Sequence, residues 1–96
     1  DFQIKHMGRR IELGEIETAL LSLEEIESAC CLYDGKRSRI VAIYKGDLSE
    51  QALRERLLAL LPEYMMPGRW YPVGEMPLNL NGKVDRQKLK ELYLTD

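Results

Sequence analysis

The sequence lacks any long apolar run, and this absence excludes a membrane-spanning helix. Such a helix needs about 20 consecutive apolar residues, whereas the longest apolar run here is Leu57-Leu58-Ala59-Leu60-Leu61. The N-terminal residues are polar and charged, so we expect no signal peptide. A starting methionine is also missing. We therefore expect the chain to be an excerpt from a longer, cytoplasmic protein.

An excess of basic residues is missing as well. The chain has 14 lysines and arginines against 16 aspartates and glutamates, which gives a net charge of −2. Nucleic-acid-binding domains are usually basic. A small nucleic-acid binder would depend on the basic segment 5–10 alone, so we do not expect a nucleic-acid partner.

Cysteine is scarce, and its placement excludes the usual cysteine-based sites. Cys30 and Cys31 are adjacent, which makes them poor disulfide partners, and no second Cys pair or His cluster completes a zinc site. On a strand the two side chains point to opposite faces. We interpret both as packing residues in a reducing compartment, and we expect no metal site.

The length of 96 residues is enough for one domain, which we expect to span residues 1–96. A domain of this size buries roughly 60–65% of its unfolded surface. That supports one modest core and leaves little room for a deep substrate pocket. A domain that works against a partner surface is therefore favoured over an independent enzyme.

The first half of the chain predicts a hairpin, a helix and a second hairpin. Residues 2–11 read as two short strands, with Gly8 in the turn because positive φ costs glycine nothing. Residues 13–23 carry an apolar stripe at helical spacing. Residues 26–33 and 39–45 alternate as strands around a turn signal, and the second of them is apolar enough to be central in its sheet.

The second half predicts two more helices and one short strand. A helix is expected from about 49 to 61, capped by Asp47 or Ser49 and ended by Pro62. Residues 70–73 suggest a short strand, residues 79–83 a tight turn, and residues 86–93 a last helix that Asp85 caps. The side chains expected to face inward from the two helices are Leu53, Leu57, Leu60 and Leu61, then Leu89, Leu92 and Tyr93. This order predicts an α+β fold with a small, mostly antiparallel sheet, an N-terminal β-hairpin and about three helices.

Three segments stand out from this background: residues 1–17, 61–67 and 77–86. Each has an ordinary explanation when taken alone. Charged residues at a helix start are typical of a solvated face, a proline-flanked stretch is typical of a rigid connector, and Asn-Gly-Lys is typical of a turn. Short motifs match by chance often, so only their combination carries weight.

Together, and in this order, the segments resemble the C-terminal subdomain of the adenylate-forming superfamily. This superfamily includes acyl-CoA synthetases, luciferases and the adenylation domains of nonribosomal peptide synthetases. Residues 1–17 are similar to the amino-acid adenylation motif Asp-x-Gln-[Val/Ile]-Lys-x-x-Gly-x-Arg-Ile-Glu-x-x-Glu-Ile-Glu. Residues 61–67 are similar to Leu-Pro-x-Tyr-Met-[Ile/Val]-Pro, and residues 77–86 contain Asn-Gly-Lys-[Val/Ile]-Asp-Arg. The resemblance covers the whole chain.

The resemblance implies that Lys83 is a catalytic lysine for aminoacyl-AMP formation. Its ammonium group would lie between the amino-acid carboxylate and the α-phosphate of ATP, where a fixed cation offsets the repulsion of like charges. Asn81 and Gly82 would form the turn that positions the lysine. We interpret Asp85 and Arg86 as structural residues that cap the last helix.

The resemblance also implies a mobile lid with two working orientations. Asp1 matches the hinge about which the lid rotates. After rotation the Gly8 loop would help line a channel for the phosphopantetheine thiol of a carrier protein. Lys5, Arg9 and Arg10 are further candidates on this thiolation face, although a salt bridge to an acidic neighbour explains Arg10 equally well.

Two positions beside these candidates are less informative. His6 is at a variable place in the motif, and we expect an exposed turn histidine. Met7 departs from the commonest peptide-synthetase pattern, where arginine is frequent. This departure leaves the carrier open, and a D-alanine-activating relative that loads a cell-wall carrier protein also fits.

Several parts of an adenylation enzyme are missing from the sequence. The phosphate loop, the acidic residue that holds magnesium and the specificity pocket belong, in the family, to the large N-terminal subdomain. We therefore expect this chain alone to bind no cofactor and to be inactive, with ATP, Mg²⁺ and the amino acid bound by the full enzyme. The implied protein partners are the N-terminal adenylation subdomain and the carrier protein. A stand-alone, non-catalytic module that binds a carrier protein through the same fold is the alternative.

Overall fold

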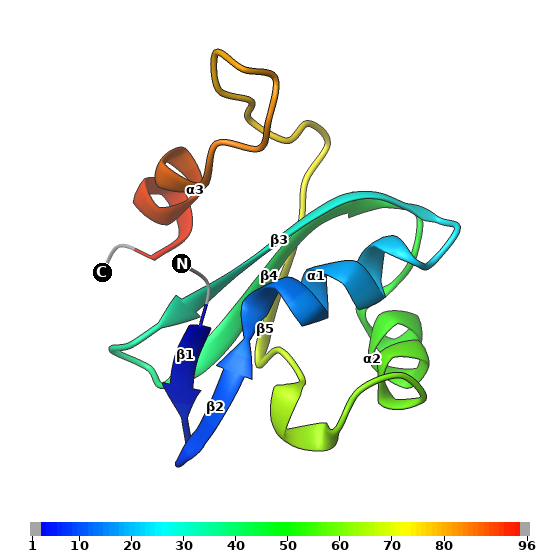
Figure 1. Cartoon of the computed structure of the whole chain (residues 1–96). Coiled ribbons are helices and arrows are strands. Elements are labelled where there is room, and N and C mark those ends of the chain that lie inside the picture. Colours follow the sequence, from blue (N-terminus) through cyan, green and yellow to red (C-terminus); the bar gives the residue numbers. More distant parts are fainter. Residues whose placement is uncertain (1–2, 95–96) are drawn as a thin grey trace.

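A computed structural model describes residues 3–94 of the chain. Its elements follow the predicted order, with one additional short 3₁₀ helix (Figure 1). They are β1 (Gln3–His6), β2 (Arg9–Glu12), α1 (Leu13–Leu21), β3 (Ile26–Asp34), β4 (Arg39–Gly46), α2 (Glu50–Leu58), η1 (Glu63–Met65), β5 (Arg69–Pro72) and α3 (Arg86–Tyr93). The predicted α+β fold is thereby confirmed.

The sheets are a two-stranded hairpin and a separate three-stranded sheet. β1 and β2 pair antiparallel, and the larger sheet has the order β3-β4-β5. β3 and β4 form the predicted antiparallel hairpin, and β4 is central as expected. β5 pairs with β4 in parallel, so the larger sheet is mixed. A parallel neighbour needs a long crossover, which residues 47–68 supply through α2 and η1.

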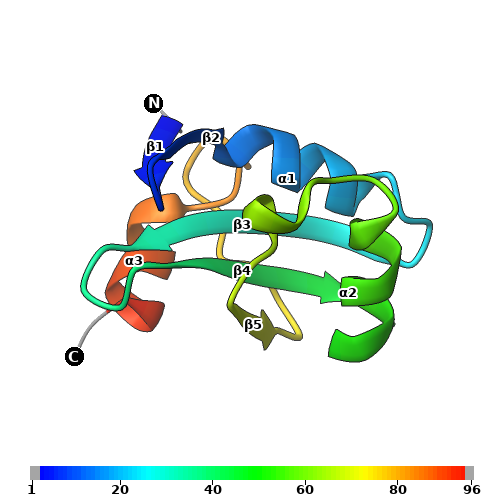
Figure 2. The same ribbon diagram turned by 90° about the horizontal axis from the view of Figure 1, so that it is seen from below.

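Helices cover both faces of the three-stranded sheet, which divides the core into two clusters (Figures 1 and 2). One face packs against α1 and α2 through side chains such as Cys31, Ala42 and Leu57. The other face packs against α3 through Cys30, Val41 and Leu89. Successive residues of a strand point to opposite faces. The two adjacent cysteines therefore serve different clusters, as the sequence predicts.

The turn of the first hairpin has an unusual backbone. Met7 and Gly8 both take positive φ, at 53° and 78°. The two-residue type I′ turn, whose twist matches that of the flanking strands, requires positive φ at both of these positions. Glycine adopts this conformation without strain. Gly8 therefore has the turn position that the sequence assigns to it.

α1 and α2 are shorter than predicted, whereas α3 has its predicted bounds of 86–93, and two expected core residues are exposed. α2 ends at Leu58, and the chain then turns away, so Leu60 is 52% exposed. Leu92 is 55% exposed. Both lie near the end of a helix, where the apolar stripe continues but no neighbouring element covers it. Leu53, Leu57 and Leu89 are buried as predicted, Ser49 caps α2, and Asp85 caps α3.

The helices of the described region are short. None of those within residues 3–94 is both long enough and apolar enough to span a lipid bilayer.

Candidate functional site

Lys83 lies in a compact loop that projects from the domain between β5 and α3. The loop closes through an isolated antiparallel bridge between Leu78 and Val84. Inside this bridge, the Asn79 N–H donates to the Lys83 carbonyl oxygen over 2.7 Å. Lys83 itself is exposed, and no carboxylate of residues 3–94 pairs with its ammonium group. The loop thus presents a cation that the described part of the chain leaves available.

Asn79 organises this loop, and the sequence interpretation missed it. Its Oδ1 atom accepts hydrogen bonds from the backbone N–H groups of Asn81 (2.9 Å) and Lys83 (3.1 Å). Its carbonyl oxygen accepts from the Gly82 N–H at 3.0 Å, where Gly82 has a φ of 79°. The signal was present in the sequence, because asparagine commonly closes a turn onto the backbone two residues ahead. Asn81 and Gly82 are therefore held by Asn79.

The helix that follows the loop is fixed to the rest of the domain by an ion pair. The Arg86 guanidinium donates to both carboxylate oxygens of Glu17, at 2.5 and 2.6 Å. It also donates to the Cys31 carbonyl oxygen at 3.3 Å, and Glu17 accepts from the Cys31 N–H at 2.7 Å. Arg86 is thus structural as predicted, but it connects α3 to α1 and β3, and Asp85 makes the cap.

Burial and neighbouring charges together shift the pKa values of Arg86, Cys30 and Cys31. Partial burial acts to lower the pKa of Arg86, but the hydrogen bonds that Arg86 donates to Glu17 outweigh this effect, and the pKa is raised. Burial raises the pKa of Cys30 to about 11 and that of Cys31 well above its usual value. Only a thiolate is a strong nucleophile or metal ligand. The two thiols therefore act as packing groups near neutral pH.

The thiolation-face candidates gather on the first hairpin. Lys5, Gly8, Arg9 and Arg10 are all exposed, and Lys5 lies opposite Arg10 in the strand register. Within residues 3–94 Arg10 has no carboxylate partner. The alternative interpretation of Arg10 as a salt-bridge residue therefore finds no partner in the described region.

Arg9 connects this hairpin to the second of the three segments. Its guanidinium carbon lies 4.5 Å from the centre of the Tyr64 ring, which is a cation–π contact. Tyr64 belongs to η1, and its neighbours Met65 and Pro67 are buried. The proline-flanked segment therefore contacts the first hairpin next to its turn.

His6 is buried, which corrects the expectation of an exposed turn histidine. Only 8% of it is exposed, and its Nδ1 atom lies 3.2 Å from the Tyr33 hydroxyl oxygen. The two rings also meet edge to face. Because the turn begins after His6, this side chain still belongs to β1 and points toward β3. Asp1, the predicted hinge, lies outside the described residues.

The Lys83 loop and the hairpin turn lie at opposite ends of the domain. Figure 1 shows the orange loop before α3 at one end of the fold and the blue turn between β1 and β2 at the other. The three-stranded sheet and α1 lie between them. The structure therefore does not bring the Lys83 loop and the thiolation-face candidates into one site.

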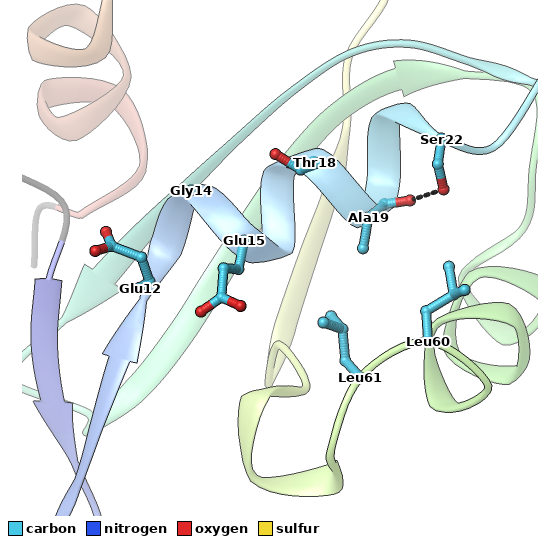
Figure 3. A pocket seen from close by; sticks show the side chains of 8 residues that line it. All are labelled: Glu12, Gly14, Glu15, Thr18, Ala19, Ser22, Leu60 and Leu61. Carbon is cyan, nitrogen blue, oxygen red and sulfur yellow. Dashed lines mark hydrogen bonds between the residues drawn. The ribbon is translucent and has the colours of Figure 1, made fainter.

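Two hollows in the surface are lined by other residues. One of about 640 Å³ runs between α1 and the chain after α2, where Leu60 and Leu61 face Ala19 while Glu12 and Glu15 lie toward the start of the helix (Figure 3). Another of about 320 Å³ lies between β1, β3 and α3, beside Arg86. The candidate residues within 3–94 thus lie on the Lys83 loop and on the first hairpin, outside both hollows. Residues 3–94 also contain no group of three or more His, Cys, Asp or Glu placed to hold a metal ion.

Comparison with curated proteins finds large synthases. The chain is 38% identical over 97 residues to gramicidin S synthase 2 of Brevibacillus brevis, with 96% of the chain and 2% of the synthase covered. It is 40% identical over 94 residues to tyrocidine synthase 3 of Brevibacillus parabrevis, covering 93% of the chain and 1% of the synthase. The chain therefore spans only a small part of these relatives. No model of a protein family matches it.

Comparison with solved structures finds the same fold in smaller enzymes. Klebsiella oxytoca NpsA, solved in complex with 3-hydroxyanthranilyl-AMSN, superposes with a TM-score of 0.90 at 28% identity, covering 98% of this chain and 20% of NpsA. A Mycobacterium tuberculosis fatty acyl CoA synthetase gives a TM-score of 0.82 at 26% identity, covering 96% of this chain and 20% of the synthetase. The whole described fold is thus a recurring part of larger enzymes. Sequence motifs, relatives and fold agree, and the chain belongs to the adenylate-forming enzymes as the C-terminal subdomain of an amino-acid adenylation domain.

Proposed function

We propose that this domain is the mobile lid of an ATP-dependent amino-acid-activating ligase of the cytoplasm, and that it serves two successive reactions. In the first, an oxygen of the amino-acid carboxylate bonds to the α-phosphorus of ATP, the bond to the β-phosphate oxygen breaks, and pyrophosphate leaves. In the second, the thiol sulfur of a carrier-bound phosphopantetheine bonds to the acyl carbon, its proton is lost, and AMP leaves. ATP, Mg²⁺ and the amino acid are held by the large subdomain.

Lys83 supplies positive charge in the first reaction. The attacking carboxylate and the phosphate are both anionic, so a cation placed between them stabilises the transition state. One close ion pair at an effective dielectric of about 20 contributes about 4 kcal/mol. That energy corresponds to roughly a thousandfold in rate. The observation that carries this assignment is an exposed ammonium group on an ordered loop, with no carboxylate partner among residues 3–94.

The first hairpin serves the second reaction. Gly8 lies at an exposed turn, with open space where a Cβ atom would lie, so the backbone there can approach a thiol arm closely. Lys5, Arg9 and Arg10 give the same face positive charge, which suits the phosphate of phosphopantetheine. Because this face and the Lys83 loop lie at opposite ends of the domain (Figure 1), a rotation would present them in turn.

The test uses the full-length enzyme that contains this chain. The proteinogenic amino acids are screened singly, and the one that gives the fastest ATP–pyrophosphate exchange is kept. Lys83→Ala should slow that exchange by two to three orders of magnitude, on the ion-pair energy above. Thioester formation on the carrier from the supplied aminoacyl adenylate should stay near the wild-type rate. Exchange at the wild-type rate in the Lys83→Ala enzyme would remove the role assigned to this lysine.

A further inference from the structure

The tip of the Lys83 loop is apolar. Leu80 is fully exposed, and no other large apolar residue among residues 3–94 is exposed to the same degree. Leu78, at the base of the loop, is 61% exposed. A single exposed leucine is common on protein surfaces. This one is distinctive because it lies three positions before the lysine on the same ordered loop.

The loop holds Leu80 and Lys83 in a fixed relation to each other. Asn79, next to Leu80, bonds to the backbone of Asn81, Gly82 and Lys83 through its side chain and its main chain. The bridge between Leu78 and Val84 closes the base. These hydrogen bonds fix the residues that precede and follow Leu80 in the loop. Any surface that receives Lys83 therefore meets Leu80 as well.

We propose that Leu80 is a positioning residue for amino-acid activation, the apolar contact through which the Lys83 loop seats on the large subdomain of the same enzyme. This inference rests on the proposed function. If Lys83 enters a substrate site on that subdomain, the rest of the loop lies against the mouth of the site. A fully exposed leucine gains free energy when such a surface covers it. The complementary surface is an apolar patch beside the site.

The same contact favours one lid orientation over the other. When the hairpin end of the domain faces the large subdomain, the Lys83 loop lies at the far end (Figure 1), and Leu80 returns to solvent. A group that is buried in only one of two states shifts the population toward that state. Leu80 thus favours the activation orientation, and it has no role in the thiol-transfer orientation.

The experiment compares Leu80→Asn with wild type in both half-reactions of the full-length enzyme. Leu80 is fully exposed and has no packing to lose against residues 3–94, so the variant should fold and melt as wild type does. ATP–pyrophosphate exchange should fall about tenfold or more, which is the loss expected when a leucine no longer becomes buried. Thioester formation from supplied aminoacyl adenylate should be unchanged or faster. Leu80→Met, which keeps an apolar side chain of similar size, should restore most of the exchange rate.

Leu58→Asn is the matched control, since Leu58 is a half-exposed leucine on α2, outside the Lys83 loop. It should leave both half-reactions near wild type. Wild-type exchange in Leu80→Asn, or an equal fall in both half-reactions, overturns the inference. Lys83→Ala, measured in parallel, separates the two proposals. An inactive Lys83→Ala with an active Leu80→Asn removes only the role of Leu80, whereas an active Lys83→Ala removes the proposed function itself.

Discussion

Single residues decide how firmly the Lys83 loop is attached to the domain. Glu17 and Arg86 are 69 positions apart, yet their side chains form the shortest ion pair in the described region. Both are partly buried, and Cys31 bonds to each of them through its backbone. Glu17 closes the first motif and Arg86 closes the third. The two motifs are thus one structural unit in the folded domain.

Glu17→Gln should destabilise the 96-residue chain by about 1–3 kcal/mol, because the Arg86 guanidinium loses its counter-charge while it stays partly buried. Urea unfolding followed by circular dichroism measures this change. Glu25→Gln is the matched control, since the Glu25 carboxylate pairs with Arg56 on the open surface. Exposed pairs contribute little, so its unfolding midpoint should hardly move. Equal losses in the two variants would contradict the assigned role of the Glu17–Arg86 pair.

At the scale of elements, the pairing of the end of β4 with the start of β3 depends on one glycine, Gly46. Gly46 is the last residue of β4 and pairs with Ile26, next to a register shift in the ladder. A Cβ atom on Gly46 would lie 2.5 Å from the Glu25 carbonyl oxygen and 2.9 Å from the Ile26 Cα. Both are backbone atoms, so no side-chain rotation relieves the clash. The two strands could then pair only after a backbone shift.

Gly46→Ala should therefore lower the free energy of unfolding by about 1–3 kcal/mol, which is the usual range for overpacking. For a domain of this size the melting temperature falls by about 4–8 °C for each kcal/mol, and a thermal melt followed by circular dichroism gives the value. Gly35→Ala is the control, because a Cβ atom at Gly35 meets no atom within 4 Å. A Gly46→Ala melting temperature equal to that of Gly35→Ala would show that the backbone yields easily here.

At the scale of the whole molecule, the sheet lies between the Lys83 loop and the turn of the first hairpin, the two ends to which we assign different tasks (Figure 1). The helices α1 and α2 cover one face and α3 covers the other, so both faces of the sheet are used for packing. The exposed loops at the ends remain for contact with a partner (Figure 1). This arrangement is what the proposed lid function requires, since the lid would present one end at a time.

Gly8→Leu in the full-length enzyme should impair the second reaction and spare the first. A Cβ atom at Gly8 meets no atom of the described residues within 4 Å, although the positive φ adds about 1–2 kcal/mol of strain. The bulk of the leucine should obstruct the thiol arm, so thioester transfer falls at least tenfold while pyrophosphate exchange persists. The opposite pattern from Lys83→Ala is the signature of two ends with separate tasks. A parallel loss of both reactions would argue against that separation.

Local patterns in the sequence determined much of this protein. Helical and strand periodicities gave the element order, because each depends on neighbours within a few residues. The turn glycine Gly8, the caps Ser49 and Asp85, and the opposite faces of Cys30 and Cys31 follow from the same local rules. The three motifs gave the family and the candidate residues, including Lys83.

Only the tertiary structure decided the remaining features, because they depend on residues distant in sequence. Leu60 and Leu92 continue apolar stripes but end up exposed where no element covers them, and His6 is buried because Tyr33 lies beside it. The parallel pairing of β5 and the bonds of Arg86 to Glu17 join segments that no local pattern connects. Lys83 was visible in the sequence as a lysine after a turn. Its fixed place beside Leu80, at the end opposite the hairpin, required the fold.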